Sequence, residues 1–124
     1  MMDRVFWINH NGKRILFTDY ANLDKDELIK VVEWSIEEVF PRFKACPPGS
    51  IRSLVDVTGT TASKAGVHAL KNVEALWKPL YLKQAIIGLT AFHQIFLHAV
   101  NKAVGSAIVA FKTREEALDW LVED

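Results

Sequence analysis

The sequence has one cysteine, Cys46, and no excess of charge of either sign, with 15 basic and 15 acidic residues among 124. A single cysteine excludes a framework of internal disulfides and fits a reducing compartment. Balanced charge leaves no field of one sign that would steer a phosphate backbone toward the protein. We therefore expect no nucleic-acid partner.

Long apolar runs are also missing. The N-terminus alternates apolar and charged residues and lacks the apolar core of a signal peptide. No run is long enough to cross a bilayer, so the sequence predicts a cytoplasmic protein without a transmembrane segment.

Signatures of metal and cofactor sites are absent too. The phosphate-binding patterns GxGxxG and GxxxxGKS/T do not occur, and the four histidines are scattered. His93 and His98 are five residues apart, which places them on different faces of a helix. We expect neither a metal nor a cofactor.

What is present is a globular composition, half apolar and a quarter charged, of a length typical of one domain, residues 1–124. Segments with strand and helix patterns alternate along it. An Asn-Gly turn predicts an N-terminal hairpin, and Asp24 and Glu27 have the spacing of a capping box. Pro41 should kink or end the helix that follows. Predicted strands are 5–8, 14–18, 51–57, 84–90 and 107–111; predicted helices are 25–43, 62–77, 91–104 and 114–121.

The order ββαβαβαβα indicates an α/β fold: a single, mostly parallel mixed sheet of about five strands with an N-terminal β-hairpin and four helices. Both faces of the hairpin strands carry apolar residues, which suggests that helices or a partner cover them.

Several local sequences resemble the STAS-like family, small stand-alone bacterial proteins similar to anti-sigma-factor antagonists and grouped with lipid-binding CRAL-TRIO domains. They run in the same order over nearly the whole chain: residues 11–16, 54–58, 83–88, 99–102 and 111–121. The resemblance implies a STAS-like fold and a regulatory or ligand-binding role, with no catalytic signature.

In anti-sigma-factor antagonists a phosphorylated serine lies in an Asp-Ser-Ser/Thr-Gly turn that opens the helix after the equivalent strand. Ser63 occupies roughly that place. Here Ala62 stands where the family has aspartate, and the following glycine, Gly66, is displaced. The departure weakens the hypothesis of a phosphorylation switch.

Polar residues follow the predicted parallel strands, whose carboxyl ends should share one edge. A helix start there favours an anion, which makes the turn after the strand 51–57 a candidate ligand site or phosphoacceptor. The simpler interpretation is that Thr60 or Thr61 caps the helix and Asp56 bonds to turn amides. Asp19 and Asp56 form a weak candidate acid–base pair. The candidates are Asp56, Thr58, Gly59, Thr60, Thr61 and Ser63, with Asp19, Thr90, Lys112 and Thr113 on the same edge.

The helix over 91–104 is apolar around more of its circumference than one core-facing stripe requires. It is either buried within the chain or covered by a second copy, or it lines an apolar groove. The candidate residues of that groove or interface are Phe92, Ile95, Phe96 and Val100.

Three functions remain open. The first is a non-enzymatic STAS-like module that binds a protein or a small ligand at the strand-end edge. The second is a carrier of a lipid or other small apolar ligand beside the helix 91–104. The third is a phosphorylation switch of the antagonist type. We expect no enzymatic activity, and either of the first two fits a homo-oligomer.

Overall fold

The computed structural model of the protein describes residues 4–123, apart from the side chains of residues 91 and 92. Five strands form one sheet in the order in which they occur in the chain. The strands are β1 (Val5–His10), β2 (Lys13–Asp19), β3 (Ile51–Asp56), β4 (Tyr81–Ile87) and β5 (Val109–Phe111). β1 is antiparallel to β2, and each later strand is parallel to its neighbour. The predicted α/β fold with a mixed, mostly parallel sheet is therefore confirmed.

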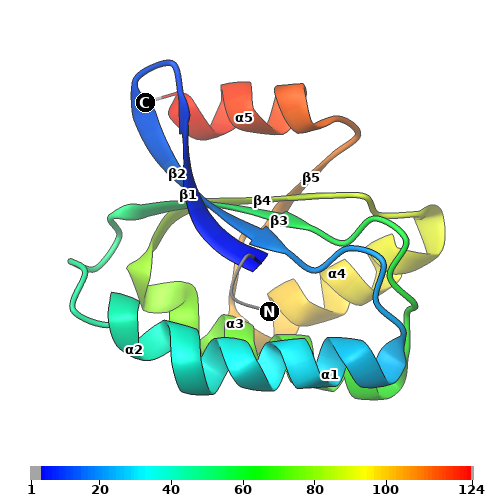
Figure 1. The fold of residues 1–124 in the computed structure, drawn as a ribbon. Helices are drawn as coiled ribbons and strands as arrows, with labels where there is room; N and C mark the ends of the chain where they lie inside the picture. The colour runs from blue at the N-terminus through cyan, green and yellow to red at the C-terminus, as the bar shows by residue number, and fades with distance from the viewer. Residues whose placement is uncertain (1–3, 124) are drawn as a thin grey trace.

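Helices cover both faces of the sheet unequally (Figure 1). Right-handed crossovers that always step to the next strand in the same direction place the connecting helices on one face. The helices on that face are α1 (Lys25–Trp34), α2 (Phe40–Phe43), α3 (Lys64–Trp77) and α4 (Ala91–Val104). The last helix, α5 (Arg114–Val122), covers the other face alone.

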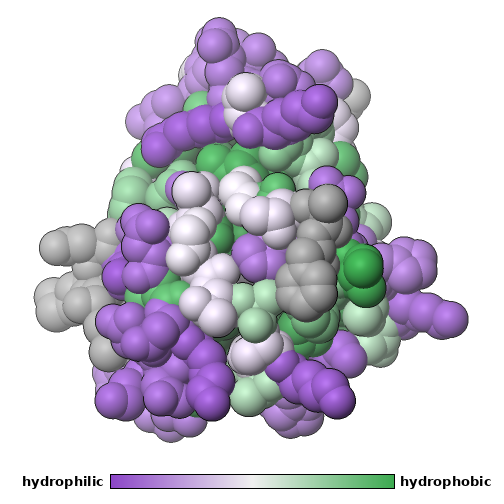
Figure 2. All heavy atoms as spheres, turned by 90° about the vertical axis from the view of Figure 1, so that its right-hand side faces the viewer, coloured by the Kyte–Doolittle hydropathy of each residue, from purple (hydrophilic) through white to green (hydrophobic). Residues whose placement is uncertain are grey.

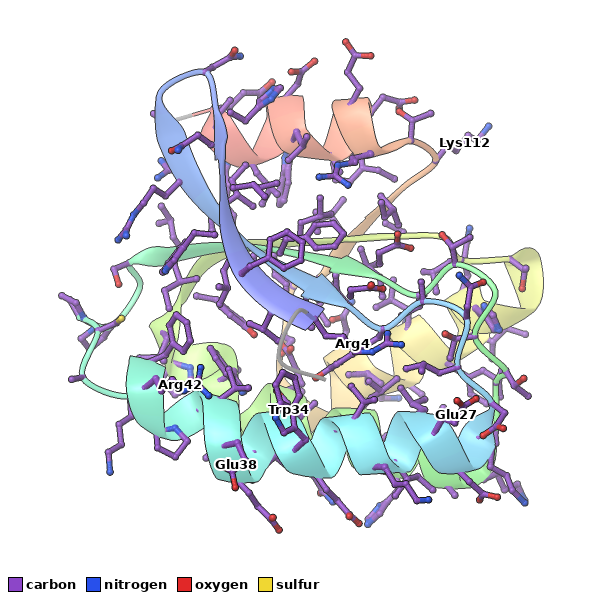
Figure 3. All side chains as sticks on the ribbon, viewed as in Figure 1. Arg4, Glu27, Trp34, Glu38, Arg42 and Lys112 are labelled. Carbon is purple, nitrogen blue, oxygen red and sulfur yellow. The ribbon has the colours of Figure 1, made fainter. Side chains whose placement is uncertain are left out.

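Alternation along the strands divides the core in two. Side chains of one parity, such as Ile15, Leu54 and Ala85, pack with Leu118 and Leu121 of α5. Those of the other parity face α1 and α3 in a larger cluster. Figure 3 shows Trp34 pointing from α1 toward the sheet, where it packs against the edge of that larger cluster.

The first long helix departs from the single helix expected up to residue 43. α1 passes into a π-helical turn, Ser35–Val39, before α2. The amide of Phe40 donates to the carbonyl of Ser35, five residues back. Pro41 has no N–H with which to continue the normal ladder, so the helix is distorted close to where the proline predicted a kink.

The bounds of several other elements also differ from those predicted. Gly88, with φ of +88°, ends β4 at Ile87, so the strand runs three residues earlier than predicted. α3 starts at Lys64 and not at residue 62, and β5 is shorter than the predicted strand over 107–111. The capping box of Asp24 with Glu27 and the left-handed Gly105 after α4 are confirmed. α3 ends at Trp77, two residues before Pro79.

Candidate functional site

The parallel strands end on one edge of the sheet, and the predicted polar residues lie in the connections there (Figure 1). The face of the molecule on this side carries a central group of side chains of intermediate hydropathy between hydrophilic ones (Figure 2). The expectation that these loops share one edge is therefore met. The hydrogen bonds and the burial of each candidate residue indicate its role.

The Asp56 carboxylate closes the turn after β3. Its Oδ1 accepts hydrogen bonds from the Thr58 amide, at 2.9 Å, and from the Thr58 hydroxyl, at 2.6 Å. A Cβ added to Gly88 would lie 2.3 Å from that hydroxyl oxygen, so the loops after β3 and β4 touch directly. The simpler interpretation of Asp56, bonding to its own turn, agrees with this geometry.

Thr60 is buried and ties two loops together. Its hydroxyl donates to the Tyr20 carbonyl and accepts from the Leu23 amide, at 3.2 Å. The neighbouring Thr61 amide donates to the Leu23 carbonyl at 2.9 Å. Thr60 therefore holds the β3–α3 loop against the β2–α1 loop and does not cap the helix.

Ser63 is the residue that caps α3. Its Oγ accepts from the Gly66 amide at 2.9 Å, which corrects the expectation that Thr60 or Thr61 would do so. The cap moved because α3 begins two residues later than expected. Thr90 and Thr113 cap α4 and α5 in the same way. The hydroxyl of each accepts from the amide three residues further along the chain, which is that of His93 or Glu116.

The remaining edge residues have structural contacts or point outward. Asp19 accepts from the Ala21 amide at 2.9 Å and forms an ion pair with Arg4 at 3.7 Å. Asp19 lies opposite Asp56 in the register of β2 and β3. The two residues are therefore neighbours, and their role as an acid–base pair stays a prediction. Figure 3 shows Lys112 pointing away from the molecule.

A cavity of about 110 Å³ lies between the sheet and the helices α1, α3 and α4. Its wall includes the predicted candidates Thr60, Thr61 and Ser63 on the loop, and Phe96 and Val100 on α4. The side chain of Phe92 lies outside the described residues. Most of the wall is apolar, and includes Leu28, Val55, Val67, Leu70, Val73, Ile86, Leu97 and Ile108.

The other candidates face elsewhere. Ile95 is 67 % exposed on the outer side of α4. Asp56, Thr58 and Gly59 are not part of the described cavity wall. The structure therefore brings the loop end 60–63 and the inner face of α4 together around one space, and leaves Asp56, Thr58 and Gly59 outside its wall.

The carboxyl group of Glu74 stands in this wall and was not among the sequence candidates. Its side chain is 6 % exposed, and its two oxygens accept from Gln84 Nε2 at 2.8 Å and Ser106 Oγ at 2.7 Å. Burial raises the pKa of Glu74, while hydrogen bonds from Ser106 and Gln84 and the charge of Lys78 oppose that rise. The available signal was its spacing: Glu74 follows Leu70 by four residues on the apolar stripe of α3.

Aromatic residues supply further polar groups of the wall. Burial raises the pKa of Tyr20 to about 12, with the Ser35 hydrogen bond opposing the rise, and raises the pKa of Tyr81 as well. Trp77 is 3 % exposed, and within the described part of the chain its Nε1–H has no hydrogen-bond partner. A buried donor without an acceptor is costly, which makes this N–H unusual among the polar groups of the wall.

Residues 4–123 show no metal-binding group and no membrane-spanning helix. No group of three or more His, Cys, Asp or Glu side chains there is arranged to hold a metal ion. Over the same residues, no helix has the length and apolar character needed to span a membrane.

Comparison with known proteins gives the fold. No protein-family model matches the chain, and no curated protein is similar to it in sequence. Among solved structures it is similar to an uncharacterised protein of the DUF3478 family with a SpoIIAA-like fold, from Shewanella loihica PV-4. The two share 16 % identity with a TM-score of 0.72, over 94 % of this chain and 91 % of the other.

Proposed function

We propose that this chain, which has a SpoIIAA-like, STAS-like fold, is a non-enzymatic binding module that takes up a small, mainly apolar ligand. The ligand occupies the cavity between the sheet and α1, α3 and α4. The observation that carries the proposal is the wall itself: apolar side chains around a few buried polar groups, one of which, Trp77 Nε1–H, has no partner among the described residues. Pockets that bind small molecules have this composition.

The placement of the cavity supports a regulatory use of binding. Its wall includes residues 60–63 of the β3–α3 loop, and Thr60 joins that loop to the β2–α1 loop. A ligand that contacts this loop end changes the surface at the strand-end edge, where the sequence predicted a partner. Binding inside the molecule and recognition outside it are then two parts of one function.

Native mass spectrometry of the chain purified from its own host tests this function. We expect a co-purified small molecule that is lost on unfolding. Val100→Trp, which places a large side chain into the cavity, should remove it, whereas Ile95→Trp on the exposed side of the same helix should retain it. If Val100→Trp does not fold, Val100→Leu replaces it. A host-purified protein that carries nothing, together with no response to any small apolar probe, would contradict the proposal.

A phosphorylation switch at Ser63 is a second candidate, favoured by one observation. Ser63 is the N-cap of α3 on a half-exposed site, the place where the resemblance puts a phosphorylated serine. A phosphate there would meet the first-turn amides and the positive end of the helix dipole. Intact-mass analysis of host-expressed protein should show an added phosphate that Ser63→Ala abolishes; an unmodified protein under all growth conditions would rule the switch out.

A further inference from the structure

We propose, on the basis of the function above, that the ligand is a neutral molecule about the size of one six-membered ring, and that it carries an oxygen which accepts the Trp77 Nε1–H. Three properties of the cavity lead to this class of compound: its volume, its charged groups and the state of its hydrogen-bonding groups.

Volume limits the ligand first. The cavity measures about 110 Å³. An engineered apolar cavity of about 150 Å³ takes up benzene, whereas pockets for drug-sized ligands are several times larger. A ring of about six to eight non-hydrogen atoms therefore fills the space, and a long acyl chain does not fit inside it.

Charge favours a neutral ligand. Among the described residues of the wall, Glu74 is the only carboxylate and neither Lys nor Arg is present. An anionic ligand would meet this carboxyl group in a medium of low dielectric, with the His93 imidazole as the only basic side chain of the described wall. A cationic ligand would lose its hydration, and the one carboxylate of the described wall that could compensate it already accepts hydrogen bonds from Gln84 and Ser106. A neutral ligand avoids both costs.

Hydrogen bonding fixes the polar group. The Trp77 Nε1–H is a donor only, and it lacks an acceptor among residues 4–123. A carbonyl, ether or hydroxyl oxygen supplies one, while a pure hydrocarbon leaves the donor buried and unpaired. The remainder of such a ligand contacts apolar side chains of α3 and α4, among them Val73, Leu97 and Val100.

Titration with matched probes tests the class. Acetophenone carries a ring and a neutral acceptor, ethylbenzene removes the acceptor, and benzoate and benzylammonium add a negative and a positive charge. The readout is the indole N–H signals of the four tryptophans in two-dimensional NMR. We expect acetophenone to shift the Trp77 signal and to bind about fivefold to tenfold more tightly than ethylbenzene, the usual worth of one hydrogen bond. Both ions should bind at least about tenfold more weakly than acetophenone.

Two variants assign the preference to its source. Trp77→Phe keeps an aromatic ring and removes the N–H, so the advantage of acetophenone over ethylbenzene should disappear. Trp34→Phe, outside the described cavity wall, should keep it. If Trp77→Phe does not fold, the shift of the Trp77 signal in the unaltered protein decides.

The outcomes separate this inference from the function on which it rests. Equal affinity for acetophenone and ethylbenzene, or tighter binding of either ion, overturns the inference and leaves the binding function standing. A host-derived ligand in native mass spectra with no binding of any ring-sized probe also overturns it, since the size argument is then wrong. Loss of both the host ligand and all probe binding removes the proposed function as well.

Discussion

The two faces of the sheet are built from the same strands but are packed differently. The face under α5, the closed face, is filled with apolar side chains, and the face toward α1, α3 and α4, the hollow face, contains the cavity. Toward α5, Ile15, Leu54, Ala85 and Leu121 are each 0 % exposed and pack as an apolar layer. Toward α1, α3 and α4, polar side chains such as Thr18, Gln84 and Glu74 are buried beside a cavity. The closed face has the composition of an ordinary apolar core, whereas the hollow face has the mix of apolar and buried polar side chains that is typical of ligand pockets.

The largest difference should appear when a leucine is cut back on each face. Leu121→Ala on the closed face should lower the free energy of unfolding by about 4 kcal/mol, because every contact of that side chain is lost into packed surroundings. Leu28→Ala, equally buried at 2 % exposure but bordering the cavity, should cost about 2 kcal/mol, since part of its surface already lacks neighbours. Urea unfolding of both variants measures this, and equal costs would mean that the second face is packed as tightly as the first.

Added side-chain volume should lower the stability of the closed face and be tolerated on the hollow face. Ala85→Val inserts carbon atoms beneath α5 and should cost about 2 kcal/mol through overpacking. Val55→Ile adds one methyl group toward the cavity and should change stability by less than about 0.5 kcal/mol or raise it. Thermal unfolding of both proteins, with probe affinity for Val55→Ile, checks the pair. A destabilisation of Val55→Ile as large as that of Ala85→Val would argue against usable space.

The hollow face should also respond to pH. The pKa of Glu74 is raised in the folded protein, so the folded state holds this proton more tightly than the unfolded chain, whose glutamate titrates near 4.5. The stability contribution of this group is therefore full below pH 4.5 and declines as pH rises through the higher folded-state pKa. Glu74→Gln removes that decline, so its stability relative to the unaltered protein should improve between pH 4 and pH 8.

Glu33→Gln is the matched control for that pH series, because it makes the same change of charge on the exposed side of α1. Subtracting its profile of unfolding free energy against pH isolates the contribution of the cavity. A flat difference between the two profiles would contradict the raised pKa of Glu74.

The smallest expected effect compares two helix caps, one on each side of the sheet. Ser63→Ala and Thr113→Ala each remove one hydrogen bond to a first-turn amide and should each cost about 1 kcal/mol. Only Ser63 also borders the cavity, so only Ser63→Ala should change the affinity for a bound probe. Chemical unfolding measures the stability of each variant, and probe titration measures its affinity for the probe. An equal change of affinity in both variants would contradict the placement of the probe beside Ser63.

Much of the fold followed from local patterns. The Asn-Gly turn, the capping box at Asp24 and the left-handed Gly105 are decided by residues close in sequence, and each was predicted correctly. The π-helical turn after Trp34 was missed because it depends on how the distorted helix packs. The order of strands and helices predicted the common edge where the polar loops meet, since topology alone brings them there.

Only some residues of the cavity wall could be predicted from the sequence. Phe96 and Val100 were identified from the wide apolar surface of the helix over 91–104, and Ser63 from the resemblance. Glu74 and Tyr20 were not, because their importance comes from burial against distant elements, which periodicity does not report. A carboxyl group at a position of the apolar stripe was the one signal in the sequence that pointed inward.

Backbone-amide NMR of the protein titrated with acetophenone tests most directly whether the hollow face is a ligand site. The account predicts saturable shifts at the Trp77 indole and at the amides of residues 60–63 and of the inner side of α4, with the amides of α5 unchanged. Shifts spread equally over both faces, or no saturable shift at any concentration, would contradict it.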